Sequence, residues 1–338
     1  RTAGLSLVER IARKALSAKL QVFTTGSVEL VDADGTYSFG SGRGPRASVC
    51  VLDPAFYPAV AFGGSVGAAE SYMDGHWTCD DLPALFRVMV LNGEVANQRT
   101  VDRGLGRITE PLNKAYHWLR RNTASGRRRN IAEHYDLGND FFKLFLDETM
   151  MYSCAVFPRE NSSLLEASQH KISRICEKLD LSPEHHLLEI GTGWGGLAIH
   201  AAKTHGCRVT TTTISKEQHR LATDRVREAG LADRVTVLQE DYRDLTGRYD
   251  RLVSVEMIEA VGYQYLDTYF EQCARLLTPQ GRMLVQGITL PEWAWDRHKS
   301  SVDFMKRYIF PGCSLISIGG VAKGHVDAVQ SFHQAVAP

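Results

Sequence analysis

The sequence carries a glycine-rich turn of a kind that holds nucleotide-like ligands. In the run EIGTGWGG, which begins at Glu189, three glycines fit the pattern GxGxxG: Gly191, Gly193 and Gly196. An apolar run precedes the turn at 186–190 and a helical stretch follows it at 197–203. Small residues there let a ligand lie against the backbone at the carboxyl end of a strand. The pattern serves either a dinucleotide or S-adenosylmethionine, so both ligands stay open at this point.

The end of the next apolar run bears on that choice. A dinucleotide site uses an acid about 20 residues beyond the turn, which holds the ribose hydroxyls. Here the run ends in the hydroxyl residues Thr211, Thr212 and Thr213, and Gln218 follows a few residues later. Because Glu217 could still serve as the acid, the dinucleotide is disfavoured without being excluded.

Two further side chains could take part in chemistry. Glu259 lies just beyond the fourth apolar run of the series, where its charge could orient a general base at the ligand edge of an α/β sheet. The alternative is a helix N-terminal acid that the helix dipole favours. Cys154 by itself is more typical of a small buried hydrophobe than of a nucleophile.

The elements that must position these residues fall into two groups. In the second half, apolar runs alternate with helical stretches, which predicts βαβ units and a parallel sheet with helices on both faces. The predicted strands are 186–190, 208–214, 234–238, 251–255 and 282–287. The first part predicts a small mixed α+β domain with a helix at 7–20, a hairpin at 27–39, a strand at 47–52 and helical stretches at 67–73 and 80–91.

A change of composition separates the two groups. Ser125-Gly126 interrupts the pattern, which places a boundary near residue 125 between domains 1–125 and 126–338. Five arginines flank this point: Arg120, Arg121, Arg127, Arg128 and Arg129. Such a cluster is either a solvated connector or a contact with anionic lipid headgroups, and Trp118 favours the second reading because indole rings suit a membrane interface.

The composition excludes several classes of protein. Acidic and basic residues balance to a formal net charge of zero, so nothing in the totals indicates a nucleic-acid partner. The seven cysteines have no metal-ligand spacing, which disfavours a disulfide framework or a zinc site and fits a reducing cytoplasm. Neither a secretory signal nor an apolar run of about 18 residues is found. We therefore expect a cytoplasmic protein that is at most peripheral on a membrane.

Four more motifs carry a resemblance that decides among the ligands. They are HYDLGNDFF at 134–142, MMYSCAVFP at 150–158, VSVEMIEAVG at 253–262 and SVDFMKRYIFPG at 301–312. Together with EIGTGWGG, in this order, they resemble the cyclopropane fatty acid synthases and the related mycolic acid methyltransferases. AESYMDGHW at 69–77 more loosely resembles the N-terminal domain of that family. The resemblance implies a Rossmann-like class I methyltransferase sheet and a smaller N-terminal domain associated with lipid.

The same resemblance implies S-adenosylmethionine as the cofactor and assigns residues to it. Its sulfonium would lie against Tyr152, Ser153 and the glycine turn, which includes Glu189 and Gly195. The ribose side would be held by Thr213, Ile214 and Gln218, with Gln218 in place of the missing acid. The adenine would be bordered by Tyr242 and Arg243.

The implied reaction transfers the methyl group to a cis double bond of an unsaturated acyl chain at the surface of a phospholipid bilayer. The resulting carbocation loses a proton and closes a cyclopropane ring. In the family the proton acceptor is a bound bicarbonate, and the matching positions here are Cys154, Glu259, Gln286 and Ile288. Position 286 is commonly histidine in relatives, and an amide carries no positive charge. The cation could therefore end instead as a methyl- or methylene-branched chain.

The end of the sequence departs from the resemblance. After Ile318 we find no likeness to the family, whose members add two strands and a tyrosine that contributes to the bicarbonate site. We expect a C-terminally incomplete sheet with the strand at 282–287 on an exposed edge. Three alternatives remain: a non-catalytic lipid-binding relative, an NAD-dependent oxidoreductase, and a methyltransferase for a small soluble acceptor. The oligomeric state stays open, with a homodimer as one alternative.

Overall fold

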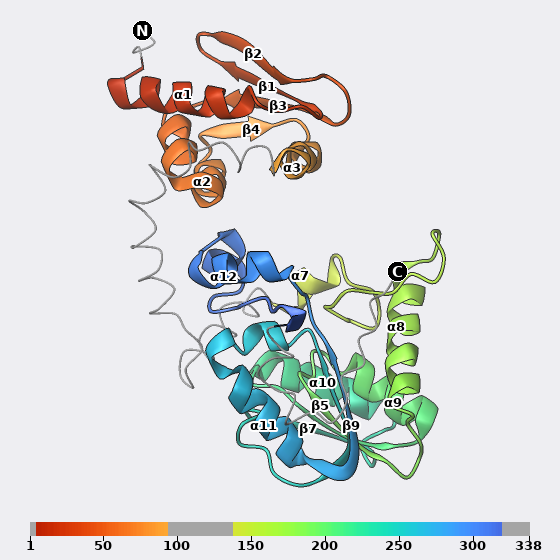
Figure 1. Cartoon of the computed structure of the whole chain (residues 1–338). Coiled ribbons are helices and arrows are strands. Elements are labelled where there is room, and N and C mark those ends of the chain that lie inside the picture. The colour runs from red at the N-terminus through yellow and green to blue at the C-terminus, as the bar shows by residue number, and fades with distance from the viewer. Residues whose placement is uncertain (1–4, 94–137, 320–338) are drawn as a thin grey trace. The chain divides into compact units, whose positions relative to one another are not determined.

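The computed structural model describes residues 5–93 and 138–319 (Figure 1). They divide into two compact units, one formed by the first range together with Ser301–Arg307 and the other by the remaining residues. The predicted boundary near residue 125 and the arginine cluster lie outside the described residues, as do the predictions for residues 320–338. The inclusion of Ser301–Arg307 in the first unit was not predicted.

The N-terminal unit is the mixed α+β domain that the sequence predicts. Its sheet has the strand order β2-β1-β3-β4. The hairpin pairs Asp32 with Gly35, and β1 and β3 run parallel. The strands are β1 (Ser27–Asp32), β2 (Gly35–Gly40), β3 (Arg46–Val51) and β4 (Trp77–Cys79), and the helices are α1 (Leu7–Leu20), α2 (Phe56–Met73) and α3 (Leu82–Leu91).

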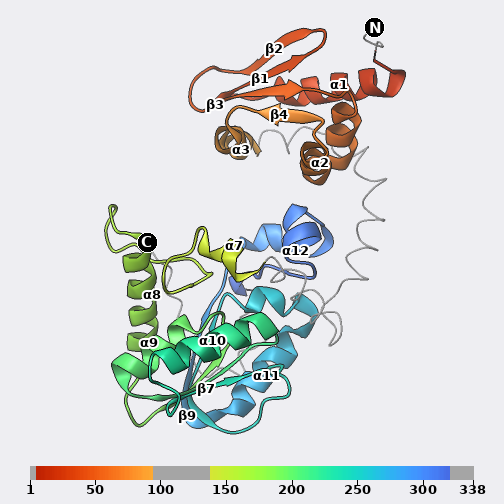
Figure 2. The same cartoon turned by 180° about the vertical axis from the view of Figure 1, so that it is seen from behind.

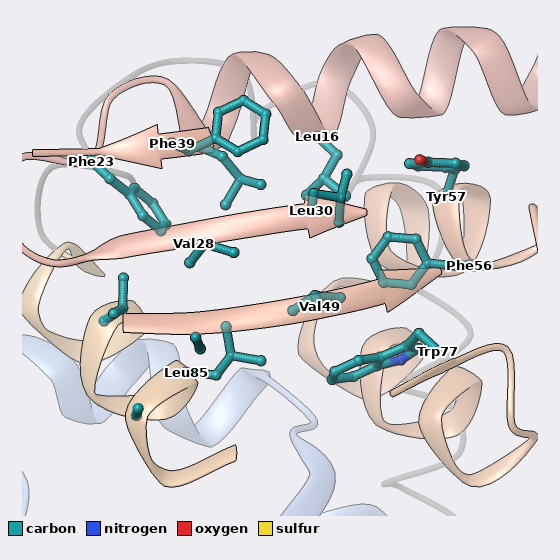
Figure 3. Close-up of a cluster of buried hydrophobic side chains, with 14 of the residues drawn as sticks. Leu16, Phe23, Val28, Leu30, Phe39, Val49, Phe56, Tyr57, Trp77 and Leu85 are labelled. Carbon is teal, nitrogen blue, oxygen red and sulfur yellow. The ribbon is translucent and has the colours of Figure 1, made fainter. Parts of the chain in front are cut away.

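One hydrophobic cluster joins this sheet to its helices (Figure 3). Helix α1 begins at a capping box formed by Ser6 and Glu9, and it buries residues four apart, Ala12, Leu16 and Leu20. These pack with the inward side chains of β1 and β3 and with Phe56 and Trp77. The spacing of apolar residues in the sequence therefore accounts for which face of α1 is buried.

The C-terminal unit is built on five parallel strands in the order β7-β6-β5-β8-β9. Figure 2 shows this unit with the strands β7 and β9 labelled. The strands are β5 (His186–Ile190), β6 (Arg208–Thr212), β7 (Val235–Leu238), β8 (Tyr249–Val255) and β9 (Leu277–Gln286). The main helices are α8 (Leu164–Lys178), α9 (Gly196–His205), α10 (Lys216–Glu228) and α11 (Leu266–Leu276). This confirms the predicted Rossmann-like sheet.

Both faces of this sheet are covered, because successive strand residues point to opposite sides. Leu187 belongs to a buried cluster with α8, α9 and α10, whereas its neighbour Leu188 belongs to a cluster with α11. The chain runs outward from β5 to β7 and then returns to the other side of β5 at β8. Ligands of open α/β sheets bind at such a reversal, outside the carboxyl ends of the strands.

Strand β9 pairs with β8 and is the last strand of the sheet within the described ranges, as the sequence predicts. Whether further strands exist stays a prediction, since it concerns residues beyond 319. In the described parts of the chain no helix is long and apolar enough to cross a membrane, and no cluster of side chains could hold a metal ion. All seven cysteines are free thiols.

Candidate active site

The glycine turn joins β5 to α9 and is held from two directions. Gly191 has a φ of +103°, a conformation that L side chains rarely adopt, and a Cβ there would lie 3.2 Å from the Met257 side chain. The amides of Gly191 and Thr192 donate to the carbonyl of Thr212. A Cβ on Gly196 would lie 2.6 Å from the carbonyl oxygen of Thr149. The turn therefore requires small residues for its shape and its packing.

Glu189 lies beneath this turn and not at its surface. Its side chain is buried, and Oε2 accepts a hydrogen bond of 2.6 Å from the Thr211 hydroxyl. Thr211 in turn lies 2.7 Å from the Thr192 hydroxyl in the turn. Burial raises the pKa of Glu189 to about 8, against a smaller lowering by Thr211. Glu189 therefore holds the turn to β6 as a neutral acid near pH 7.

The polar residues after β6 form their own network. The Thr213 hydroxyl donates to Oε1 of the Gln218 side chain at 2.7 Å. The Ser215 hydroxyl caps the N-terminus of α10 by accepting a hydrogen bond from the backbone amide of Gln218. Ile214 is half-buried between them. Glu217, the residue that could have served a dinucleotide, instead pairs with Arg220 at 2.9 Å on the outer surface of α10. This network weakens the dinucleotide alternative further.

The residues after β7 divide between the core and the sheet edge. The Tyr242 ring is buried edge-on against Tyr269, with centroids 5.3 Å apart. The Arg243 guanidinium forms two hydrogen bonds of 3.1 Å with the buried Asp241. Asp241 was not among the residues predicted from the sequence, although an acid shortly after a parallel strand is a recognisable signal. Contact of Tyr242 and Arg243 with an adenine stays a prediction.

Residues 139–154 pack against the glycine turn. The Trp194 indole donates to Asn139 in α7 (Asn139–Lys143) at 2.7 Å, and Arg225 binds the carbonyls of Trp194, Glu148 and Thr149. The Phe142 ring is buried 4.9 Å from Trp194 and 5.2 Å from Tyr152. Aromatic side chains therefore border the turn beside Tyr152.

Ser153 is held by a lysine that was not predicted from the sequence. Lys171, on α8, is 2% exposed and donates to the Ser153 hydroxyl. Burial lowers the pKa of Lys171, and the nearby charge of Glu256 opposes that shift. The signal in the sequence was a lysine next to Ile172 on the apolar face of a helix, a place where an unpaired charge is costly.

Glu256 links two of the predicted site residues. It follows β8 with a φ of +48°, which is unusual for a residue with a side chain. Its Oε1 accepts from the backbone amide of Cys154 at 2.8 Å and from the side-chain amide of Gln286 at 2.8 Å. The Gln286 side chain also donates to the Cys154 carbonyl at 3.3 Å. Gln286 thus donates hydrogen bonds to the Glu256 carboxylate and to the main-chain carbonyl of Cys154. The Cys154 thiol takes no part in these bonds.

Glu259 is joined to Ile288 beside this cluster. It lies in a short 3-10 helix, Ile258–Ala260, and its Oε1 accepts from the Ile288 amide at 2.5 Å. Its Oε2 is buried and has no hydrogen-bond partner in the described part of the chain. Burial raises the pKa of Glu259 to about 7. Its carboxyl group is therefore bound just beyond the end of β9. A role as a helix N-terminal acid alone does not explain this bond.

These contacts test whether the four positions assigned to bicarbonate fit that ion. The structure brings Cys154, Glu259, Gln286 and Ile288 together at the ends of β8 and β9. However, the amide of Cys154 and the Gln286 side chain already bind Glu256, and the amide of Ile288 binds Glu259. A second anion would meet two carboxylates and engaged donors, so these residues do not fit bicarbonate in this arrangement.

Comparison with known proteins identifies the family. Residues 122–334 match the family model described as mycolic acid cyclopropane synthetase. The chain belongs to this family. Because the match continues past Ile318, the prediction that the likeness ends there is wrong: the matched range reaches residue 334.

The relatives include lipid-modifying enzymes of two kinds. The chain is 39% identical over 310 residues to the tuberculostearic acid methyltransferase UfaA1 of Mycobacterium tuberculosis, covering 86% of this chain and 68% of that protein. It is also 39% identical over 290 residues to the cyclopropane-fatty-acyl-phospholipid synthase of Escherichia coli strain K12, covering 84% and 70%.

Solved structures agree with this assignment. The cyclopropane synthase MmaA2 from Mycobacterium tuberculosis aligns with a TM-score of 0.55 at 31% identity, covering 60% of this chain and 74% of that one. The mycolic acid cyclopropane synthase CmaA1, solved with SAH and CTAB, aligns with the same TM-score and coverage at 33% identity. The chain is thus a lipid-modifying methyltransferase that depends on S-adenosylmethionine, and the dinucleotide alternative is set aside.

Proposed function

We propose that this protein transfers a methyl group from S-adenosylmethionine to the cis double bond of an unsaturated acyl chain in a phospholipid and forms a cyclopropane fatty acid. One observation supports it most directly. A glycine turn of the cofactor-binding type and two hydrogen-bonded carboxylates, Glu256 and Glu259, lie at the same edge of the parallel sheet. Methyl transfer to an alkene needs both a cofactor site and a proton acceptor nearby.

The residues divide this work in the following way. S-adenosylmethionine supplies an electrophilic methyl group. Tyr152, Ser153 and the glycine turn would lie against its sulfonium, Thr213, Ile214 and Gln218 against its ribose, and Tyr242 and Arg243 beside its adenine. An alkene is a weak nucleophile, so the chain must hold it in line with the methyl group and exclude water. The rings of Phe142 and Tyr152 are apolar and would help to exclude water. Their aromatic faces would also stabilise the positive charge that develops on carbon.

A second product is favoured by one specific observation. The side-chain amide of Gln286 donates a hydrogen bond to Glu256. Position 286 therefore holds a neutral amide beside the carboxylate and not a titratable cation. A methylene-branched chain, or a methyl-branched chain that keeps a double bond, would then be the end of the same transfer after loss of a proton. A tuberculostearic acid methyltransferase and a cyclopropane synthase are equally similar to this chain, so identity does not separate the two products.

The proposed reaction does not include the bicarbonate that the resemblance implies. We derive no step through it, because its donors are engaged by the carboxylates of the chain itself.

We also propose that the protein acts from the cytoplasmic side as a peripheral membrane protein. Helix α1 exposes Leu7, Val8 and Ile11 by 66%, 55% and 54%, and α3 exposes Val90 by 79%. Apolar side chains of this size suit a bilayer surface. Flotation of the full chain with vesicles of unsaturated anionic phospholipid tests this, and replacing Leu7 and Ile11 with serine should reduce the bound fraction. Unchanged flotation would remove α1 from the proposed contact.

Product analysis tests the proposed reaction. Lipid extracts from a host that expresses the chain should show acyl chains that have gained one CH2, and the ring protons of a cyclopropane should be visible by NMR. Branched methyl or methylene signals would select the second product. Tight binding of S-adenosylmethionine without any gain would instead support a non-catalytic lipid-binding protein. Methylation of a small soluble acceptor in place of lipid would overturn the substrate class.

A further inference from the structure

We propose that the carboxylate of Glu256 is the proton acceptor of the reaction, in the place where the family resemblance puts a bicarbonate ion. This inference rests on the proposed methyl transfer to an alkene. It concerns a residue that the family resemblance did not assign to the site.

The backbone at Glu256 is the first observation. Its φ of +48° lies in the left-handed region, which residues with a Cβ rarely adopt. A glycine would adopt this conformation without strain. Backbone strain of this kind persists where the surrounding structure over-determines it, often at functional sites. The chain thus keeps a glutamate at a point where the backbone favours glycine, directly at the carboxyl end of β8.

The contacts of the carboxylate are the second observation. Oε1 accepts both hydrogen bonds, from the Cys154 amide and from the Gln286 side chain, each at 2.8 Å. Oε2 takes part in neither bond. Lys171 lies close enough for its charge to interact with Glu256, and it is tied to Ser153. Two polar groups from separate segments therefore fix Oε1 and leave Oε2 to accept a proton.

Glu259 differs from Glu256 in what its second oxygen can reach. Its Oε1 is bound by Ile288, and its Oε2 is enclosed without a partner among the described residues. Glu256 is half-buried, so it has access that Glu259 lacks. The negative charge of Glu256 also favours the protonated form of Glu259. The difference in access assigns proton acceptance to Glu256, because its second oxygen belongs to a half-buried side chain whereas that of Glu259 is enclosed.

The step balances without a further reactant. The bond between sulfur and the methyl carbon breaks with its electron pair on sulfur, and the π electrons of the alkene form the new carbon–carbon bond. Oε2 of Glu256 then takes a proton from the added methyl group, and the released C–H pair closes the ring. If a hydride shifts first, the same pair forms a methylene double bond. The carboxyl group afterwards returns its proton to water.

The test uses the full chain with unsaturated phospholipid vesicles, in buffer freed of carbon dioxide and in buffer with added bicarbonate. Wild-type kcat should be the same in both. Glu256→Gln should lower kcat about 100-fold or more, the range of a positioned general base, with the calorimetric affinity for S-adenosylmethionine unchanged. Without bicarbonate, the kcat of Glu256→Gly should be as low as that of Glu256→Gln. Its kcat should rise when bicarbonate or formate is added.

The variants are chosen so that folding does not confuse the result. Glycine suits the φ of residue 256, so Glu256→Gly removes the carboxylate without adding backbone strain. Glu271→Gln changes an exposed glutamate on α11 and serves as the matched control, with wild-type kcat expected.

Several outcomes would overturn the assignment. Wild-type activity that disappears without bicarbonate returns the role to that ion. Full activity of Glu256→Gln together with loss in Glu259→Gln moves it to Glu259. Both results leave the proposed methyl transfer intact. A wild-type chain that binds S-adenosylmethionine but methylates no lipid in either buffer contradicts the proposed function and this assignment together.

Discussion

At the ends of β5 and β6 the polar side chains bind one another, whereas at the ends of β8 and β9 polar groups converge on two carboxylates. Glu189, Thr211 and Thr192 form one chain of hydrogen bonds, and Thr213 and Gln218 form another. Across the sheet reversal, Glu256 has a strained backbone, and Glu259 has an oxygen without a partner in the described structure. We call these the β5–β6 half and the β8–β9 half of the edge.

The difference indicates a division of labour along one edge of the sheet. A surface that satisfies its own hydrogen bonds keeps its shape before a ligand arrives, which lowers the cost of binding. Strained backbone and unsatisfied acids are costly and persist where chemistry uses them. The β5–β6 half is therefore suited to binding, and the β8–β9 half to moving a proton.

The largest expected effect concerns the acid of the β5–β6 half. Burial raises the pKa of Glu189 to about 8 from 4.5, so the folded protein holds a proton that the unfolded chain releases above pH 4.5. The free energy of unfolding should then fall as pH rises from 5 to 8, with a Glu189 contribution on the order of 3 kcal/mol. Glu189→Gln should remove this contribution in urea unfolding measured at both pH values.

The matched control for that measurement is Glu184→Gln, which changes an exposed glutamate just before β5. It should keep the wild-type slope. If the free energy of unfolding changed with pH equally in Glu189→Gln and in wild type, Glu189 would be charged in the folded protein. The β5–β6 half would then contain a buried charge, and the contrast with the β8–β9 half would not hold.

The next effect tests the shape of the turn itself. Gly191→Val places a branched side chain at a φ of +103° and against Met257. Strain of about 1–3 kcal/mol should weaken S-adenosylmethionine binding by about 5- to 150-fold, measured by calorimetry. Gly63→Ala, at an open position in α2, should bind normally. Normal binding by Gly191→Val would contradict a preformed turn.

A smaller effect is expected from the buried cation behind the β8–β9 half. Lys171→Met removes the positive charge near Glu256 and the donor to Ser153, and kcat should fall about tenfold, or about 1.4 kcal/mol. Lys178→Met, at the exposed end of α8, should keep the wild-type rate. If Lys171→Met lowers the affinity for S-adenosylmethionine and not kcat, the lysine belongs to the binding half.

The smallest effect sharpens the binding half. Thr213→Val removes the hydroxyl that orients Gln218, a hydrogen bond worth about 1 kcal/mol. Affinity for S-adenosylmethionine should fall about fivefold with kcat unchanged. Thr236→Val, exposed on β7, is the control. A change in kcat without a change in affinity would show that the two halves are not separate.

Much of this edge could be predicted from the sequence. The apolar run at 186–190 predicts both bounds of β5, and the glycine turn and Gln218 follow from short patterns. The prediction failed where a role depended on conformation. In the sequence, Glu256 is one more acid within VSVEMIEAVG, and its φ and its bonds to Cys154 and Gln286 distinguish it. Those bonds could not be predicted because Cys154 lies 102 residues and Gln286 lies 30 residues from Glu256 along the chain.

Lys171 and the grouping of Ser301–Arg307 show the same limit. A lysine in an amphipathic helix is normally placed in solvent, and here Ser153 and the charge of Glu256 help to offset the cost of its burial. The segment Ser301–Arg307 lies within a motif that resembles the methyltransferase family, yet its contacts group it with the N-terminal unit.

By itself the sequence determined the family, the order of the parallel strands along the chain and the residues that reach their carboxyl ends, because periodicity and local motifs encode these directly. The tertiary structure alone decided which of the acids are bonded, strained or left without a partner, and hence which one the proton chemistry is assigned to. Burial and hydrogen bonding between distant segments set those properties, and no local pattern of residues contains them.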